Sequence, residues 1–125
     1  MRKVLFVVLV FNMILEGLTA ARLISLPLLL EDFDPTIQGG YILYGFAAFS
    51  IAISIAWFSK YSDTESSLAF GLGILSTFHI CLTIGCAMLS NTPGALGHGL
   101  LFLAFLFLFF NRVNCLPTVE DQKNF

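Results

Sequence analysis

Four ionisable side chains interrupt long apolar runs of the sequence: Glu16, Arg22, His79 and His98. Ionisable groups deep in a membrane are costly, so they usually face other helices and pair with a partner. A carboxylate and imidazoles in such surroundings are suited to a structural hydrogen bond, a proton relay, or ligation of a metal ion or haem. Their spacing and depth indicate which of them could act together.

Polar residues recur at helical spacing in two of the apolar runs, and each set marks one helix face. The first set is Asn12, Glu16 and Thr19, and the second is Ser76, His79, Thr83 and Cys86. Polar side chains in lipid form hydrogen bonds across helices, so these two faces are expected to meet. We therefore predict a contact between Glu16 and His79, which in its simplest form fixes the packing of two helices.

Depth in the membrane groups these residues into two levels. At about 1.5 Å per helical residue, Glu16 lies roughly 18 Å and His79 roughly 16 Å from the cytoplasmic edge. Arg22 and His98 lie roughly 27 Å and 24 Å from that edge, and Tyr44 comes close to this second level. The predicted intramembrane polar cluster comprises Asn12, Glu16, Arg22, Tyr44, His79 and His98.

The composition defines the class of protein that must position this cluster. Of 125 residues, 58% are hydrophobic and 11% are charged, and the mean hydropathy is +0.90. Soluble domains carry about 25% charged residues, so this chain has too few charges to cover a water-facing surface. A net charge of -2 without a basic cluster excludes a nucleic-acid-binding class. The chain is therefore expected to be an integral membrane protein.

Four apolar stretches, at residues 4–30, 41–58, 68–89 and 94–110, are each close to the length that crosses the hydrocarbon layer as a helix. Polar breaks separate them, and these read EDFDPTIQGG, SKYSDTESS and SNTPG. We expect an all-α integral membrane fold, a four-transmembrane-helix antiparallel bundle forming one membrane domain over residues 1–125. Residues 111–125 are expected to form a short, frayed polar tail on the cytoplasmic side.

Basic residues predict the orientation, because loops rich in Lys and Arg stay in the cytoplasm. With the N-terminus inside, five of the six basic residues are cytoplasmic: Arg2, Lys3, Lys60, Arg112 and Lys123. The exception is Arg22, near the outer end of the first span. Glu31, Asp32 and Asp34 then form an acidic outer loop, which we expect to be solvated. Size and layout are similar in outline to small bacterial membrane proteins, which favours a bacterial cytoplasmic (inner) membrane.

The first span admits a second interpretation. A basic start, an apolar core and the small residues TAA also form the layout of a secretory signal peptide. Cleavage after Ala21 would leave three spans and an outside N-terminus. Two observations favour an uncleaved helix: apolar residues resume from Leu23 to Leu30, and Asn12 and Glu16 interrupt the core.

Small residues mark the expected packing faces, because close approach of backbones drives helix association in lipid. The candidates for helix packing are Gly45, Ala48, Ala52, Ala56, Ser76 and Thr83. The last span carries more phenylalanine than one interface needs, at Phe102, Phe105, Phe107, Phe109 and Phe110. Some of these rings are expected to face lipid or the helices of another protein.

Three functions stay open at this stage. We favour a small non-catalytic accessory or assembly subunit, because no catalytic motif is present and packing faces abound. Its partners would be the lipid bilayer and a larger membrane protein complex or further copies of itself. The first alternative is a haem- or quinone-binding redox subunit that uses His79 and His98, although no CxxCH motif is present. The second alternative is proton or small-solute permeation through Glu16 and His79.

Overall fold

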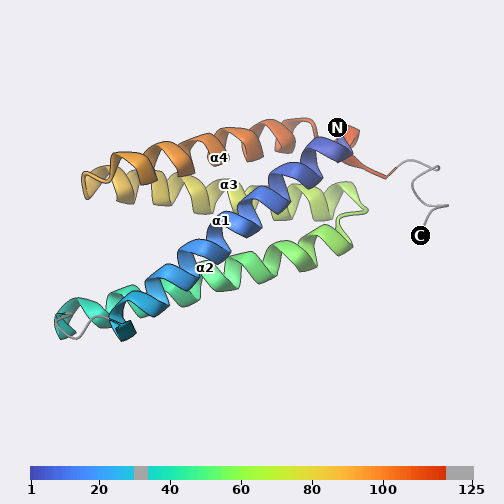
Figure 1. Ribbon diagram of the computed structural model, residues 1–125. Coiled ribbons are helices and arrows are strands. Elements are labelled where there is room, and N and C mark those ends of the chain that lie inside the picture. Colours follow the sequence, from blue (N-terminus) through green and yellow to red (C-terminus); the bar gives the residue numbers. More distant parts are fainter. Residues whose placement is uncertain (30–33, 118–125) are drawn as a thin grey trace. The chain divides into compact units, whose positions relative to one another are not determined.

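The computed structural model describes residues 1–29 and 34–117, and all regular structure in these ranges is helical (Figure 1). The elements are α1 (Arg2–Leu29), α2 (Pro35–Tyr61), α3 (Glu65–Met88), α4 (Thr92–Phe110) and the 3-10 turn η1 (Arg112–Cys115). Each of the four α-helices is long and apolar enough to cross a membrane. Residues 30–33, which include the predicted loop acids Glu31 and Asp32, and residues 118–125 lie outside the described ranges.

The helices start earlier than the apolar runs because polar residues form their first turns. α2 begins at Pro35, whose fixed φ and missing N–H suit a first helical turn. α3 begins at Glu65 because Thr64 and Ser67 form a reciprocal capping box. In α4, the Asn91 side chain accepts a hydrogen bond from the N–H of Gly94 at 3.2 Å. The hydropathy of the sequence therefore predicts the apolar central part of each helix. The residues at which α2, α3 and α4 begin depend on proline and on capping residues.

Helix length exceeds the hydrocarbon thickness in three of the four helices. α1 has 28 residues and α2 has 27, which at the ordinary helical rise is about 40 Å for each helix. α4 has 19 residues and spans about 28 Å, close to the thickness of the hydrocarbon layer. The longer helices therefore either tilt or extend into the headgroup region.

The described helices group into two compact units, residues 9–57 and residues 1–8 with 58–125. In the first unit, α1 and α2 approach closely at Gly45. A Cβ atom at this position would lie 2.7 Å from Ile24 Cγ1 and 3.3 Å from the Ala20 carbonyl oxygen. Gly45 therefore permits a close approach of the two helices, because a side chain at this position would meet α1.

The buried stripe of α2 differs in one position from the predicted row of small residues. Gly45, Ala48 and Ala52 are buried, whereas Ala56 is exposed and Ile55 is buried at 2% exposure. Ala48, Ala52 and Ala56 follow a strict four-residue repeat, which drifts around a helix of 3.6 residues per turn. This row therefore leaves the buried face after two members.

In the second unit, α3 and α4 form a helical hairpin, drawn side by side in Figure 1. Cys86 lies near Gly94 at the turn, and Thr83 lies near Gly99 one helical turn further from it. The connection between the helices includes Ser90, whose φ of 56° lies in the left-handed region. The predicted packing residues Ser76 and Thr83 both lie in this hairpin, Ser76 buried and Thr83 half-buried.

The polar end of this second unit is more ordered than a frayed tail. The Arg2 guanidinium donates hydrogen bonds to the carbonyl oxygens of Ser62 and Cys115, both at 3.2 Å. Arg112 forms an ion pair with Glu65 at 2.9 Å. The start of α1, the α2–α3 connection and η1 therefore meet at one end, and the expected tail is structured as far as Cys115.

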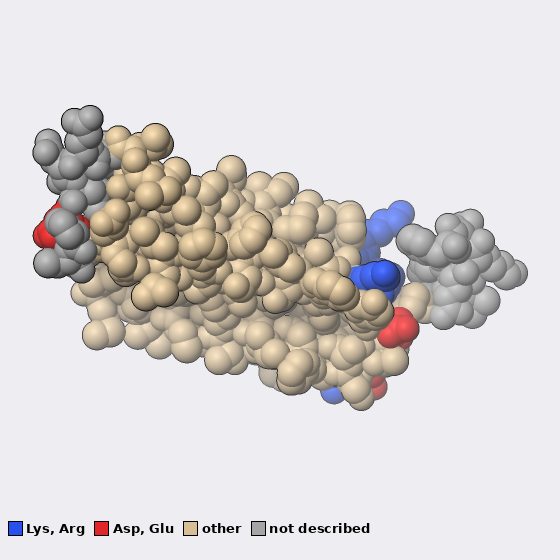
Figure 2. Space-filling view, turned by 90° about the horizontal axis from the view of Figure 1, so that it is seen from below, with Lys and Arg blue, Asp and Glu red and all other residues tan. Residues whose placement is uncertain are grey.

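Apart from Glu16 and Arg22 on α1, the charged side chains of the described residues lie toward the ends of the helices or in the connections between them. Figure 2 shows a face on which Lys, Arg, Asp and Glu are coloured near the ends, with a long uncharged stretch between. Such an uncharged band is the surface that a hydrocarbon layer requires, because a charge at its centre costs several kcal/mol.

Candidate functional site: a buried histidine pair

His79 on α3 and His98 on α4 face each other inside the α3–α4 hairpin. His79 is fully buried and His98 is 8% exposed. They are the only two histidines of the chain. The hairpin places both rings in the apolar middle of its helices, where polar groups need a partner because water does not supply one.

The two rings meet through their Nδ1 atoms, which lie 3.0 Å apart. This is an ordinary N–H···N hydrogen-bond distance. The ring centroids are 5.2 Å apart and the planes differ by 27°, so the nitrogens point at each other and the rings do not overlap. One Nδ1 therefore carries a proton and donates, while the other accepts and its ring carries its proton on Nε2. The neutral pair thus combines two different tautomers.

Aromatic rings enclose His79. Phe105 of α4 lies nearly parallel to it, with centroids 5.5 Å apart and planes 14° apart. Phe78 meets the imidazole edge-on at 5.1 Å. Among the described residues, the buried Nε2 of His79 has no hydrogen-bond partner, and two aromatic rings contact the imidazole.

The contact between the two histidines is closer than the predicted depths imply. The depths predicted from the edges of the apolar runs place the two histidines roughly 7–8 Å apart along the helix axis. In the structure, α3 ends at Met88 and α4 begins at Thr92, which reduces the offset to about 5 Å. Side chains bridge such an offset easily, so the rings meet.

The other predicted cluster members belong to the unit that contains residues 9–57. Asn12 and Glu16 lie on the low-exposure stripe of α1, together with Leu5, Leu9 and Ala20. Arg22 is exposed and occupies a different face of α1. Tyr44 is half-buried on α2. The proposed contact between Glu16 and His79 joins the two units and stays a prediction.

The distance between the two Nδ1 atoms tests whether His79 and His98 could hold a haem iron between them. Two imidazoles on opposite sides of a haem iron would hold their nitrogens about 4 Å apart, with the macrocycle between the rings. Here the nitrogens are 3.0 Å apart and in direct contact. His79 and His98 in this arrangement do not fit axial ligation of haem, which would require the hairpin to open.

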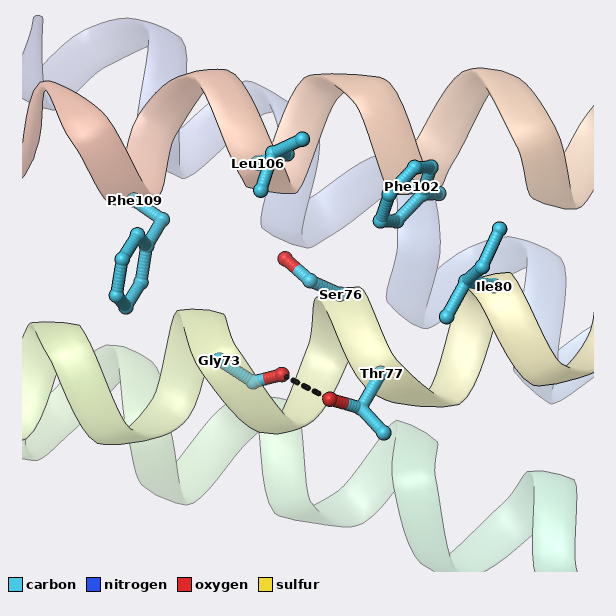
Figure 3. Close-up of a pocket in the computed structure, with 7 residues that line it drawn as sticks. All are labelled: Gly73, Ser76, Thr77, Ile80, Phe102, Leu106 and Phe109. Atoms are coloured by element: carbon cyan, nitrogen blue, oxygen red, sulfur yellow. Dashed lines mark hydrogen bonds between the residues drawn. The ribbon is translucent and has the colours of Figure 1, made fainter.

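A groove of about 250 Å³ lies between α3 and α4 of the hairpin (Figure 3). α3 contributes three small residues and Ile80 to it, and α4 contributes large residues. The lining residues are Gly73, Ser76, Thr77, Ile80, Phe102, Leu106 and Phe109. Both hydroxyls bond to their own helix, Ser76 to the Leu72 carbonyl and Thr77 to the Gly73 carbonyl. The groove therefore presents an essentially apolar surface.

Two contacts were not predicted from the sequence. Phe105 stacks on His79, and Arg2 bonds to the carbonyl oxygens of Ser62 and Cys115. Phe105 follows His98 by seven residues, a spacing that places two residues on one helix face and could have revealed the stacking. No local pattern indicates that Arg2 reaches Ser62 and Cys115, because those contacts join positions far apart in the chain.

The length and apolar character of the four helices indicate a membrane protein. Comparison with protein-family models, curated proteins and solved structures gave no match. The function is therefore inferred from the histidine pair and from the surfaces of the helices.

Proposed function

We propose that this protein is a small, non-catalytic accessory or assembly subunit that packs against the transmembrane helices of a larger complex. It would be a four-helix antiparallel bundle with both termini in the cytoplasm, in a bacterial inner membrane. The observation that carries the proposal is the exposed face of α4. This face consists of Leu96, Leu100, Leu103, Phe107 and Phe110.

The spacing of that face fits helix packing. Its members alternate steps of four and three residues, which is the interval of a helix–helix seam. The opposite face of α4, with His98, Leu101, Phe105 and Leu108, has the same interval and is already buried in the chain. An accessory subunit needs two such faces on one helix, one for its own fold and one for its partner.

Site-specific photocrosslinking tests this role. A photoreactive phenylalanine analogue at Phe107, which is 55% exposed, should crosslink to one identifiable membrane protein in intact membranes. The same analogue at Phe105, which is fully buried, is the matched control and should give no intermolecular product. The wild-type protein should co-purify with that partner in mild detergent. A stable, monodisperse free monomer without crosslinks at Phe107 would contradict the proposal.

A second candidate is proton or small-solute permeation, and the buried His79–His98 hydrogen bond favours it. A chain of hydrogen-bonded imidazoles is a recognised means of passing a proton through an apolar layer. The predicted nearness of Glu16 to His79 would extend that chain. Protein in liposomes should then dissipate an imposed pH gradient, and Glu16→Gln should abolish the flux. A flux equal to that of empty liposomes would remove this candidate.

A further inference from the structure

We propose that His79 and His98 together bind one transition-metal ion through their two Nδ1 atoms. This site is independent of the accessory role, because it lies within the α3–α4 hairpin and uses no residue of the exposed α4 face.

The distance between the ligands supports chelation by both rings. A tetrahedral ion with metal–nitrogen bonds of about 2.0–2.1 Å holds two imidazole nitrogens about 3.3–3.4 Å apart. The Nδ1 atoms are already 3.0 Å apart and face each other. The rings must separate by only a few tenths of an ångström and turn slightly, so that both lone pairs point to the ion.

The proton balance is also favourable. The neutral pair holds one proton between its Nδ1 atoms, and an ion needs both lone pairs. The donating ring can shift that proton to its own Nε2, so binding releases no net proton. Where His79 is the donor, its Nε2 makes no hydrogen bond within the described residues and is free to accept the proton.

The donor set defines the class of ion. Imidazole nitrogens suit Zn, Cu, Ni and Fe, whereas Mg²⁺ and Ca²⁺ require oxygen ligands. Zn²⁺ is usually four-coordinate and tetrahedral, so the two imidazoles would supply half of its ligands. A carboxylate at the depth predicted for Glu16 would offset part of the positive charge.

The binding test uses the full-length protein in detergent with an affinity tag that contains no histidine. Since the chain has two histidines, every imidazole ligand then comes from this pair. Titration with Co²⁺, a spectroscopic substitute for Zn²⁺, should produce visible bands at one equivalent, and Zn²⁺ but not Mg²⁺ should displace them. Cu⁺ is tested by competition with a chromophoric chelator.

Variants assign the ligands. His79→Ala and His98→Ala should each weaken Zn²⁺ binding by at least about 100-fold. Thr83→Ala is the matched control: its hydroxyl bonds to the His79 carbonyl of its own helix, and metal affinity should be unchanged. If the histidine variants fail to fold, nitrogen NMR of the wild type gives the answer, because Zn²⁺ should shift both Nδ1 signals and leave a proton on the Nε2 atom of each ring, where the free pair has a proton on only one of them. Binding that persists in His98→Ala, ligation through Nε2, or no binding of any of the three ions would overturn the proposal.

Discussion

The hydrogen bond between His79 and His98 joins two helices inside an apolar enclosure. If one imidazole is removed, the other keeps a buried nitrogen without its partner, at a cost of about 1–3 kcal/mol. Removal of His79 should lower the free energy of unfolding by more than the loss of one hydrogen bond, because its ring also stacks on Phe105. Double substitution separates the contribution of the hydrogen bond from that of the stacking.

We expect a double-mutant cycle of His79→Ala and His98→Ala to give a coupling energy of about 1 kcal/mol, the usual strength of hydrogen bonds between membrane helices. Unfolding in mixed micelles measures the four free energies. Thr77→Val is the control, because Thr77 is exposed and its hydroxyl bonds only to its own helix in the described structure. A coupling energy near zero would show that the two rings do not interact.

Cys115 permits a second test at this scale. Its thiol is fully buried, and burial raises its pKa above the ordinary value, while the N-terminal ammonium and Arg2 partly oppose that rise. The raised pKa means that the folded protein favours the neutral thiol more than the unfolded chain does. The neutral Cys115 thiol therefore stabilises the fold below the pKa of the unfolded chain, and this stabilisation is lost as pH rises through the raised pKa of the folded protein. Alkylation should therefore be slow at neutral pH, with a midpoint above the value of about 8.5 for a free thiol.

Arg2→Lys should speed this alkylation several-fold at fixed pH. The substitution keeps the positive charge but loses the guanidinium that bonds the Ser62 and Cys115 carbonyls. The measurement uses protein in which Cys81 and Cys86 are replaced by Ala, with Lys3→Ala as the surface control. Equal rates in the Arg2 and Lys3 variants would mean that Arg2 does not hold this end together.

At the scale of elements, sequence reasoning found all four helices because an apolar run of sufficient length has one solution in lipid. It did not find which face each helix buries. α4 is apolar on every side, so no periodicity separates the buried Phe105 from the exposed Phe107. The histidines were recognised from their cost in lipid, but their direct contact depends on where the connection between α3 and α4 begins and ends.

The close approach of α1 and α2 at Gly45 predicts a steric effect. Gly45→Ala should destabilise the protein by about 1–3 kcal/mol, because the new methyl group meets Ile24 and the Ala20 carbonyl. Gly17→Ala is the matched control on α1, where a Cβ atom has no neighbour within 4 Å. That change should be neutral or stabilising by up to about 1 kcal/mol. Unfolding in mixed micelles measures both, and equal effects would contradict close packing at Gly45.

At the scale of the whole molecule, Arg2, Arg112 and Lys60 lie near one end of the second unit as far as the structure describes it. Arg2 contacts the α2–α3 connection and η1, and Arg112 pairs with Glu65 at the start of α3. Lys60 lies in the last turn of α2, beside the same connection. Two of these basic groups therefore both stabilise local structure and add to the positive charge that favours a cytoplasmic location.

The positive charge of this end predicts the topology. An alkaline phosphatase fusion after Cys115 should be inactive and a green fluorescent protein fusion at the same place fluorescent, because both report a cytoplasmic location. A phosphatase inserted at Asn91, between α3 and α4, should be active.

Charge substitution then tests the cause of that topology. Replacing Arg2, Lys3 and Lys60 by Gln and adding three arginines between Ser90 and Asn91 moves the basic excess to the opposite end, so both reporters should reverse in part of the population. The three-arginine insertion alone is the control and should change the reporters less. An active phosphatase after Cys115 in the wild type would contradict a cytoplasmic C-terminus, and unchanged reporters in the charge variant would show that another feature sets the orientation.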